Sequence, residues 1–223
     1  MNLSLDGGEF FALGGSLNKR LLDIAIDSNT KINKATMTDK TNLASKLADL
    51  KLIQNVLIDC GQKLMTATDD KTIRERLEKM LESDRENLGY IDKAITQFGQ
   101  DVQPRDITQK HAEKIGQMMD GSELTEYDKF FQFELLKHQQ TMTGLVVHKV
   151  AQSLDDELQD AMESLNKVNF ENRAHQEVLK GVLYFVGTRE LAGQDPDMGI
   201  WASVEQGIAA LKGAVSSAAS AAS

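Results

Sequence analysis

Apolar residues recur at steps of three and four along most of the chain between residues 40 and 190. This spacing keeps one face of a helix apolar over many turns and is typical of amphipathic α-helices. The first two such stripes predict helices at about 40–67 and 70–98. Their apolar positions are Leu43, Leu47, Leu50, Ile53, Leu57, Cys60 and Leu64, and Ile73, Leu77, Leu81, Leu88, Ile91, Ile95 and Phe98.

Two further stripes predict long helices at about 123–153 and 156–190. Brief polar turns at residues 68–70 and 154–156 separate the helices of each pair, and so short a turn between long helices implies an antiparallel hairpin. Between Gly99 and Glu123 the pattern weakens over about two dozen residues, which is long enough to cross a bundle and includes a short helix. The pattern therefore predicts an all-α fold of hairpin, long crossover and hairpin.

The two ends of the chain have a different character. Residues 1–15 are Gly-rich and read as an irregular arm, followed by a helix at about 16–36. We interpret 16–193 as one helical bundle domain. Residues 194–223 hold an amphipathic helix, anchored by Trp201, and an Ala/Ser tail. We expect the arm and the C-terminal helix to contact a second copy or a protein partner.

Polar residues interrupt the stripes of the last two long helices. One stripe reads Tyr127, Phe131, Glu134, His138, Met142 and Leu145; the other reads Val168, Glu171, His175, Val178 and Val182. Both interruptions are Glu-x-x-x-His, a spacing of one helical turn. His138 lies 16 residues before residue 154 and Glu171 lies 17 after it, which sets the pairs at nearly one height in an antiparallel hairpin.

Three interpretations of these pairs are open. Carboxylates and neutral imidazoles on facing helices suit iron, manganese or zinc. Alternatively, Glu134 bonds His175 and Glu171 bonds His138 without a metal, since buried polar groups need partners. In the third interpretation, the inward face of each helix is shifted by one residue from the one assigned here, and the pairs lie at the solvent-exposed edge of the bundle. The helix at 70–98 adds Asp84 as a ligand, and that at 40–67 offers only Asp59.

Residues 40–190 resemble the ferritin-like superfamily, particularly its small bacterial stress-associated members. The resemblance is carried by LIQNVLIDCGQKL, LEKMLESDRENLGYIDKAI, FELLKHQQTMTG and FENRAHQEVL. It implies a ferritin-like antiparallel four-helix bundle, here with extra N-terminal, crossover and C-terminal helices. It also implies non-haem iron or manganese chemistry. The superfamily's usual motif is Glu-x-x-His, one residue shorter than either pair, and Asp84 and Asn87 stand where another acid–His pair is expected.

The resulting hypothesis is a protein that binds one or two ions for iron handling or for peroxide- and oxygen-linked stress protection, through Glu134, His138, Glu171, His175 and Asp84. The alternative hypothesis is a non-catalytic helical interaction or assembly module without metal. The sparse ligands of the first hairpin and the unusual ends of the chain favour it.

The composition of the chain indicates which partners and which location to expect. The net charge is −9, and the Lys and Arg residues are dispersed among acidic ones. Binding to nucleic-acid phosphates needs clustered Lys and Arg side chains, so we expect no nucleic-acid partner. The chain has a single cysteine, Cys60, so it cannot form an intramolecular disulfide. Cys60 lies in an apolar stripe, which predicts a buried and unreactive thiol. No stretch approaches the roughly 20 apolar residues of a membrane span, and the first residues make a poor signal peptide. A cytoplasmic location is the resulting expectation.

Overall fold

The computed structural model describes residues 40–99, 102–153, 159–160 and 162–221. The chain divides into two units, Met1–Asn42 and Leu43–Ser223. The arm expected at 1–15 and the helix expected at 16–36 lie outside the described residues.

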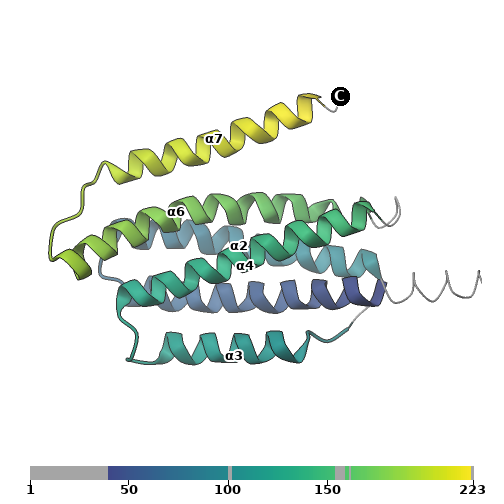
Figure 1. Ribbon diagram of the computed structural model, residues 1–223, viewed down its shortest axis with the longest axis horizontal. Helices are drawn as coiled ribbons and strands as arrows, with labels where there is room; N and C mark the ends of the chain where they lie inside the picture. Colours follow the sequence, from purple (N-terminus) through teal and green to yellow (C-terminus); the bar gives the residue numbers. More distant parts are fainter. Residues whose placement is uncertain (1–39, 100–101, 154–158, 161, 222–223) are drawn as a thin grey trace, which may run out of the picture. The chain divides into compact units, whose positions relative to one another are not determined.

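All regular structure in the described part of the chain is helical, which confirms the all-α class. Residues 40–67 form the first described helix. It is followed by α2 (Lys71–Phe98), α3 (Asp106–Asp120), α4 (Glu126–Gln152), α6 (Ser164–Ala192) and α7 (Ile200–Ala221) (Figure 1).

Local sequence signals fix the ends of these helices. The Asp70 carboxylate accepts the backbone N–H groups of Thr72 and Ile73 at the start of α2. Gly99 ends the same helix at φ 73°, a left-handed conformation that glycine adopts without strain. At the start of α4, Thr125 and Asp128 form a reciprocal capping box.

Contacts between side chains define how the helices run. Helix 40–67 is antiparallel to α2, since Gln54 bonds Asp84 while Lys51 pairs with Asp92. α6 is antiparallel to α2, since Ser83 bonds His175 while Tyr90, further along α2, bonds the earlier Lys167. α6 is also antiparallel to α4, since Lys137 bonds Asn172 while the earlier Tyr127 bonds the later Glu190. α2 and α4 therefore run in the same direction. α3, which connects them in the chain, lies along the outer side of the bundle, at the bottom of the view in Figure 1.

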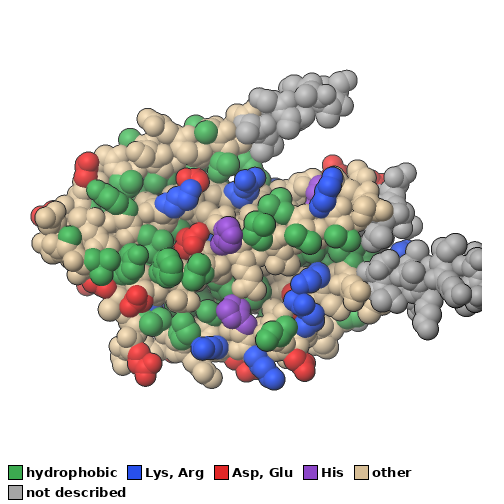
Figure 2. Space-filling view, viewed as in Figure 1, with side chains coloured by type: hydrophobic (Ala, Val, Ile, Leu, Met, Phe, Trp, Pro, Cys, Tyr) green, Lys and Arg blue, Asp and Glu red, His purple; other side chains and the backbone are tan. Residues whose placement is uncertain are grey.

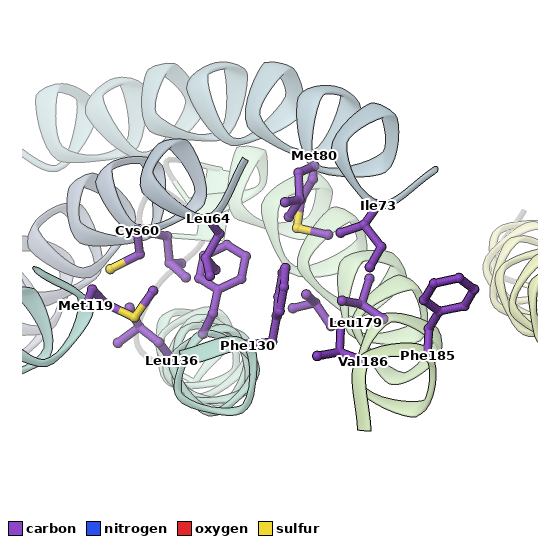
Figure 3. Packing of buried hydrophobic residues seen from close by; sticks show 14 of the residues in the cluster. Cys60, Leu64, Ile73, Met80, Met119, Phe130, Leu136, Leu179, Phe185 and Val186 are labelled. Carbon is purple, nitrogen blue, oxygen red and sulfur yellow. The ribbon is translucent and has the colours of Figure 1, made fainter. Parts of the chain in front are cut away.

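The core consists of two hydrophobic clusters. The larger gathers side chains from residues 53–64, α2, α3, α4, α6 and α7, with Phe130 and Phe133 fully buried (Figure 3). The smaller gathers Leu43, Leu47, Leu50, Ile91, Ala94, Val147, Ala151, Met162, Leu165 and Val168. On α2, α4 and α6, buried polar residues lie between the members of the two clusters, and the buried Gln54 of helix 40–67 bonds to them. This polar layer comprises Gln54, Asp84, Asn87, Lys137, Gln140, Thr141, Asn169, Asn172 and His175.

The predicted register of α4 is wrong. Its buried face is Phe130, Phe133, Leu136, Lys137, Gln140, Thr141, Gly144, Val147 and Ala151. Phe131 and Met142, assigned to the inward stripe, are 40% and 48% exposed. The error arises because α4 carries apolar residues on two faces, so that two stripes fit the same spacing.

Other expectations hold. Cys60 is fully buried, and burial raises the pKa of its thiol to about 12, which makes it unreactive. Trp201 packs its ring 5.8 Å from that of Phe185 and anchors α7 to α6, as predicted. Among the described residues, no helix has the length and apolar character needed to cross a membrane.

Candidate functional site

Lys137 lies at the centre of the polar layer with no exposed surface. Its ammonium donates to the Asp84 carboxylate, to Asn172 Oδ1 at 3.1 Å and to His175 Nδ1 at 3.0 Å. The three protons of the ammonium therefore have three acceptors, which is the arrangement that a charge needs inside a protein.

Asp84 is held by amides from the opposite side. Gln54 Nε2 donates to the Asp84 carboxylate and to its backbone carbonyl, each at 3.0 Å. The Gln140 amide donates in turn to Gln54 Oε1 at 3.1 Å and to the Leu50 carbonyl at 2.9 Å. The polar layer thus links helix 40–67, α2, α4 and α6 in one network.

The electrostatics favour a charged pair beside a neutral imidazole. Burial alone raises the pKa of Asp84, but the Lys137 ammonium and His175 outweigh it and hold that pKa below its usual range. Burial lowers the pKa of Lys137, and the carboxylate of Asp84 offsets part of this effect. Burial and the Lys137 charge lower the pKa of His175. The three acceptors around Lys137 fit its ammonium form, and the lowered pKa of His175 favours the uncharged imidazole beside it.

His175 links this buried network to Ser83. The distance from His175 Nε2 to Ser83 Oγ is 2.7 Å. Because Lys137 donates to Nδ1, the hydrogen-bond network assigns the proton to Nε2, which donates to Ser83. The Ser83 hydroxyl donates in turn to the Met80 carbonyl at 3.2 Å. The imidazole is therefore a donor toward Ser83 in this arrangement.

Ser83 and His175 also line a groove of about 530 Å³ between α2, α6 and α7. The groove carries charges of both signs, from Arg76, Lys79 and Lys212 and from Glu75, Glu171 and Glu205. Arg76 stacks 4.1 Å above the Trp201 ring and pairs with Glu205 at 3.1 Å. The groove thus offers a hydroxyl and basic side chains to a ligand at the edge of the bundle.

The proposed metal ligands do not converge. Glu134 is half-buried and His138 exposed, and both contact Gln176, at 3.1 and 3.0 Å. Glu171 lines the groove, whereas Asp84 and His175 bind Lys137. Asp59 is exposed and pairs with Lys63. Within the described ranges, no three His, Cys, Asp or Glu side chains form a group that could hold a metal ion.

The placement of Glu134 and His138 on the core face was therefore wrong, and the shift of register explains it. Lys137 occupies the inward position that was assigned to His138. Sequence reasoning also missed Ser83, Gln54, Gln140 and Asn172. One signal was available: Phe130, Phe133, Lys137, Gln140 and Gly144 form a second stripe at helical spacing.

Comparison with known proteins identifies a relative of this chain. No protein-family model and no solved structure matches the chain. The chain is similar to a DNA nickase of Nostoc sp. (strain PCC 7120 / SAG 25.82 / UTEX 2576), with 46% identity over 181 residues. The match covers 81% of this chain and 52% of the nickase, so the chain spans about half the length of that relative.

This similarity contradicts three predictions made from the sequence. A relative named for cutting DNA conflicts with iron handling and metal-linked stress protection, and with a non-catalytic assembly module. It also conflicts with the exclusion of nucleic acid. That exclusion relied on the net charge of the whole chain, which does not forbid a local contact with a DNA strand.

Proposed function

We propose that this chain takes part in nicking DNA, the breakage of one phosphodiester bond in one strand of a duplex. The observation that carries the proposal is the 46% identity over 181 residues to the Nostoc DNA nickase. Identity of this level over 81% of the chain supports a shared role. Since the match covers 52% of the nickase, the proposal concerns participation in the reaction by the part that is shared.

The groove between α2, α6 and α7 is the proposed contact with the DNA strand. Ser83 offers a hydroxyl there, beside the N–H of the buried His175. Lys79 and Lys212 supply positive charge, which positions phosphate without reading base sequence. Lys137 hydrogen-bonds His175 from behind, and the His175 N–H in turn hydrogen-bonds Ser83, so the buried network positions the hydroxyl of the groove.

A plasmid assay tests the proposed activity. Purified chain incubated with supercoiled plasmid and Mg²⁺ or Mn²⁺ should produce open circles before any linear DNA, and the activity should co-elute with the 24.7 kDa chain on gel filtration. Absence of open circles above the blank with both cations, at protein excess, would contradict nicking by this chain.

Matched variants test the groove. We expect Ser83→Ala and His175→Asn to reduce the rate of nicking at least tenfold. The first removes the hydroxyl of the groove, and in the second the side chain is too short to replace the Nε2–H group that bonds this hydroxyl. Ser153→Ala and His138→Asn change an exposed serine and an exposed histidine outside the groove and should retain the full rate. Equal rates for all four variants would place the reaction elsewhere.

The ferritin-like bundle remains our proposal for the finer architecture. α2 and α4 run in the same direction, and the segment that connects them contains α3, which supports this topology. An experimental structure in which α2 and α4 run in opposite directions would be incompatible with this topology.

A further inference from the structure

The outer face of α4 carries a stripe of exposed apolar side chains. Phe131, Leu135, Met142, Val146 and Val150 are 40%, 44%, 48%, 54% and 40% exposed. Steps of four and seven residues keep most of them on one side of the helix, over a length of about 28 Å at 1.5 Å per residue. Hydrophobic side chains gather over α4 on the face shown in Figure 2.

The stripe widens near the start of α4. Phe131 stacks on Tyr127 with ring centroids 6.3 Å apart, and the Tyr127 ring lies against Gly187 of α6. Tyr184, three residues before Gly187 on α6, is a further exposed aromatic residue, at 49%. An apolar surface of this extent commonly marks a protein contact.

Charges at the two ends of α4 are opposite. Glu126 and Asp128 lie in the first turn and Lys149 in the last. A second α4 laid antiparallel on the first would bring the acidic end of each helix to the basic end of the other. A two-fold axis near His138 and Gln139 sets Phe131 opposite Val146, Leu135 opposite Met142, and Asp128 opposite Lys149.

We infer that α4 is the interface of a homodimer, in which the exposed stripe packs antiparallel against the same stripe of a second copy of this chain. DNA is a poor occupant, because DNA contacts use clustered Lys and Arg whereas the stripe is apolar. The charges of the stripe are complementary to those of the same stripe rotated about a two-fold axis, and this favours a second copy over an unrelated partner. This inference goes beyond the proposed nicking activity and does not depend on it.

Analytical ultracentrifugation over a concentration series tests the inference. The full chain should sediment with twice the 24.7 kDa mass of one copy. Leu135→Lys should raise the dissociation constant of the dimer by about 30-fold or more, the size expected for a central interface residue. Ile107→Lys, on α3, changes a residue that is 68% exposed outside the stripe and should leave the dimer intact.

A charge-pair rescue tests the antiparallel register. Leu135→Lys combined with Met142→Glu in one chain places opposite charges across the two-fold axis, so the dimer should recover at least tenfold of the lost affinity relative to Leu135→Lys alone. Circular dichroism of each variant checks that helicity is retained, since both positions are exposed in the single chain. A monomer at all concentrations up to about 100 μM, or a dimer that Leu135→Lys leaves unchanged, overturns the proposal.

Discussion

The ammonium of Lys137 is buried between helices yet has acceptors for all of its protons. Asp84 supplies the charge that balances it, while Asn172 and His175 accept the remaining hydrogen bonds. A buried ion pair of this kind adds little net stability compared with apolar residues of the same volume. Removal of one partner is different, since the other charge is left buried without compensation.

We therefore expect Lys137→Met to lower the free energy of unfolding by about 3–5 kcal/mol, because the Asp84 carboxylate loses its counter-charge. Urea denaturation followed by circular dichroism measures this change. Lys93→Met, at an exposed position on α2, should stay within about 0.5 kcal/mol of the unaltered chain. Combining Lys137→Met with Asp84→Asn should recover part of the loss, and a double variant less stable than Lys137→Met would contradict the account.

His175 should make stability depend on pH. Burial, the Lys137 charge and the neighbouring Asp84 and Glu171 act together on this imidazole, and the net effect lowers its pKa below 6.5. The unfolded chain therefore binds a proton at a higher pH than the folded chain. By linkage, the free energy of unfolding is at its full value above pH 6.5 and falls as pH drops below it.

Urea unfolding between about pH 5 and 8 measures this dependence. His175→Gln should flatten the curve, because glutamine does not titrate and retains a donor for Ser83. Burial also lowers the pKa of the His148 imidazole, so His148→Gln should remove a separate and smaller part of the slope. An unchanged slope in His175→Gln would show that this imidazole titrates alike in both states.

At the scale of helices, α7 lies against α6 through a close approach at Gly181. A Cβ atom at this position would lie 2.6 Å from Val204 and 2.8 Å from the Trp201 ring. No side chain fits such a separation, so Gly181→Ala should push α7 away from α6. The chain has a single tryptophan, and its emission therefore reports this contact alone.

We expect Gly181→Ala to shift the Trp201 emission to longer wavelength, as the ring leaves its buried position and meets water. Gly89→Ala is the matched control, since nothing lies within 4 Å of its added Cβ in α2. The control should keep the emission and gain up to about 1 kcal/mol of stability from its better helix propensity. Identical spectra for the two variants would mean that α6 and α7 are not in close contact.

The helices themselves were predictable from spacing, but the inward face of α4 was not. Helices 40–67 and α2 have one apolar stripe each, and their predicted boundaries agree with the structure to within a few residues. α4 has apolar residues on two faces, and the choice between them depends on which partner helix it meets. The burial of Lys137 was not predicted, because its three acceptors come from α2 and α6, far away in sequence.

At the scale of the whole molecule, the net charge of −9 limits the electrostatic part of the proposed contact with DNA. Proteins that bind through many basic side chains lose affinity steeply with salt, by a slope of about −0.9 per phosphate contact in a plot of log K against log salt. In the groove of this chain, Arg76 already pairs with Glu205, and two further acids lie among the basic residues. Few phosphates can therefore be neutralised there.

We expect a shallow salt dependence, with a slope no steeper than about −3 between roughly 50 and 200 mM salt. Fluorescence anisotropy of a labelled duplex measures it. Lys79→Ala and Lys212→Ala should each reduce the slope by about 1, because each removes one of the proposed phosphate contacts in the groove. Lys51→Ala, whose side chain pairs with Asp92 outside the groove, should leave the slope unchanged. A slope of about −6 or steeper would instead require a strongly basic face, which the charges of this groove do not provide.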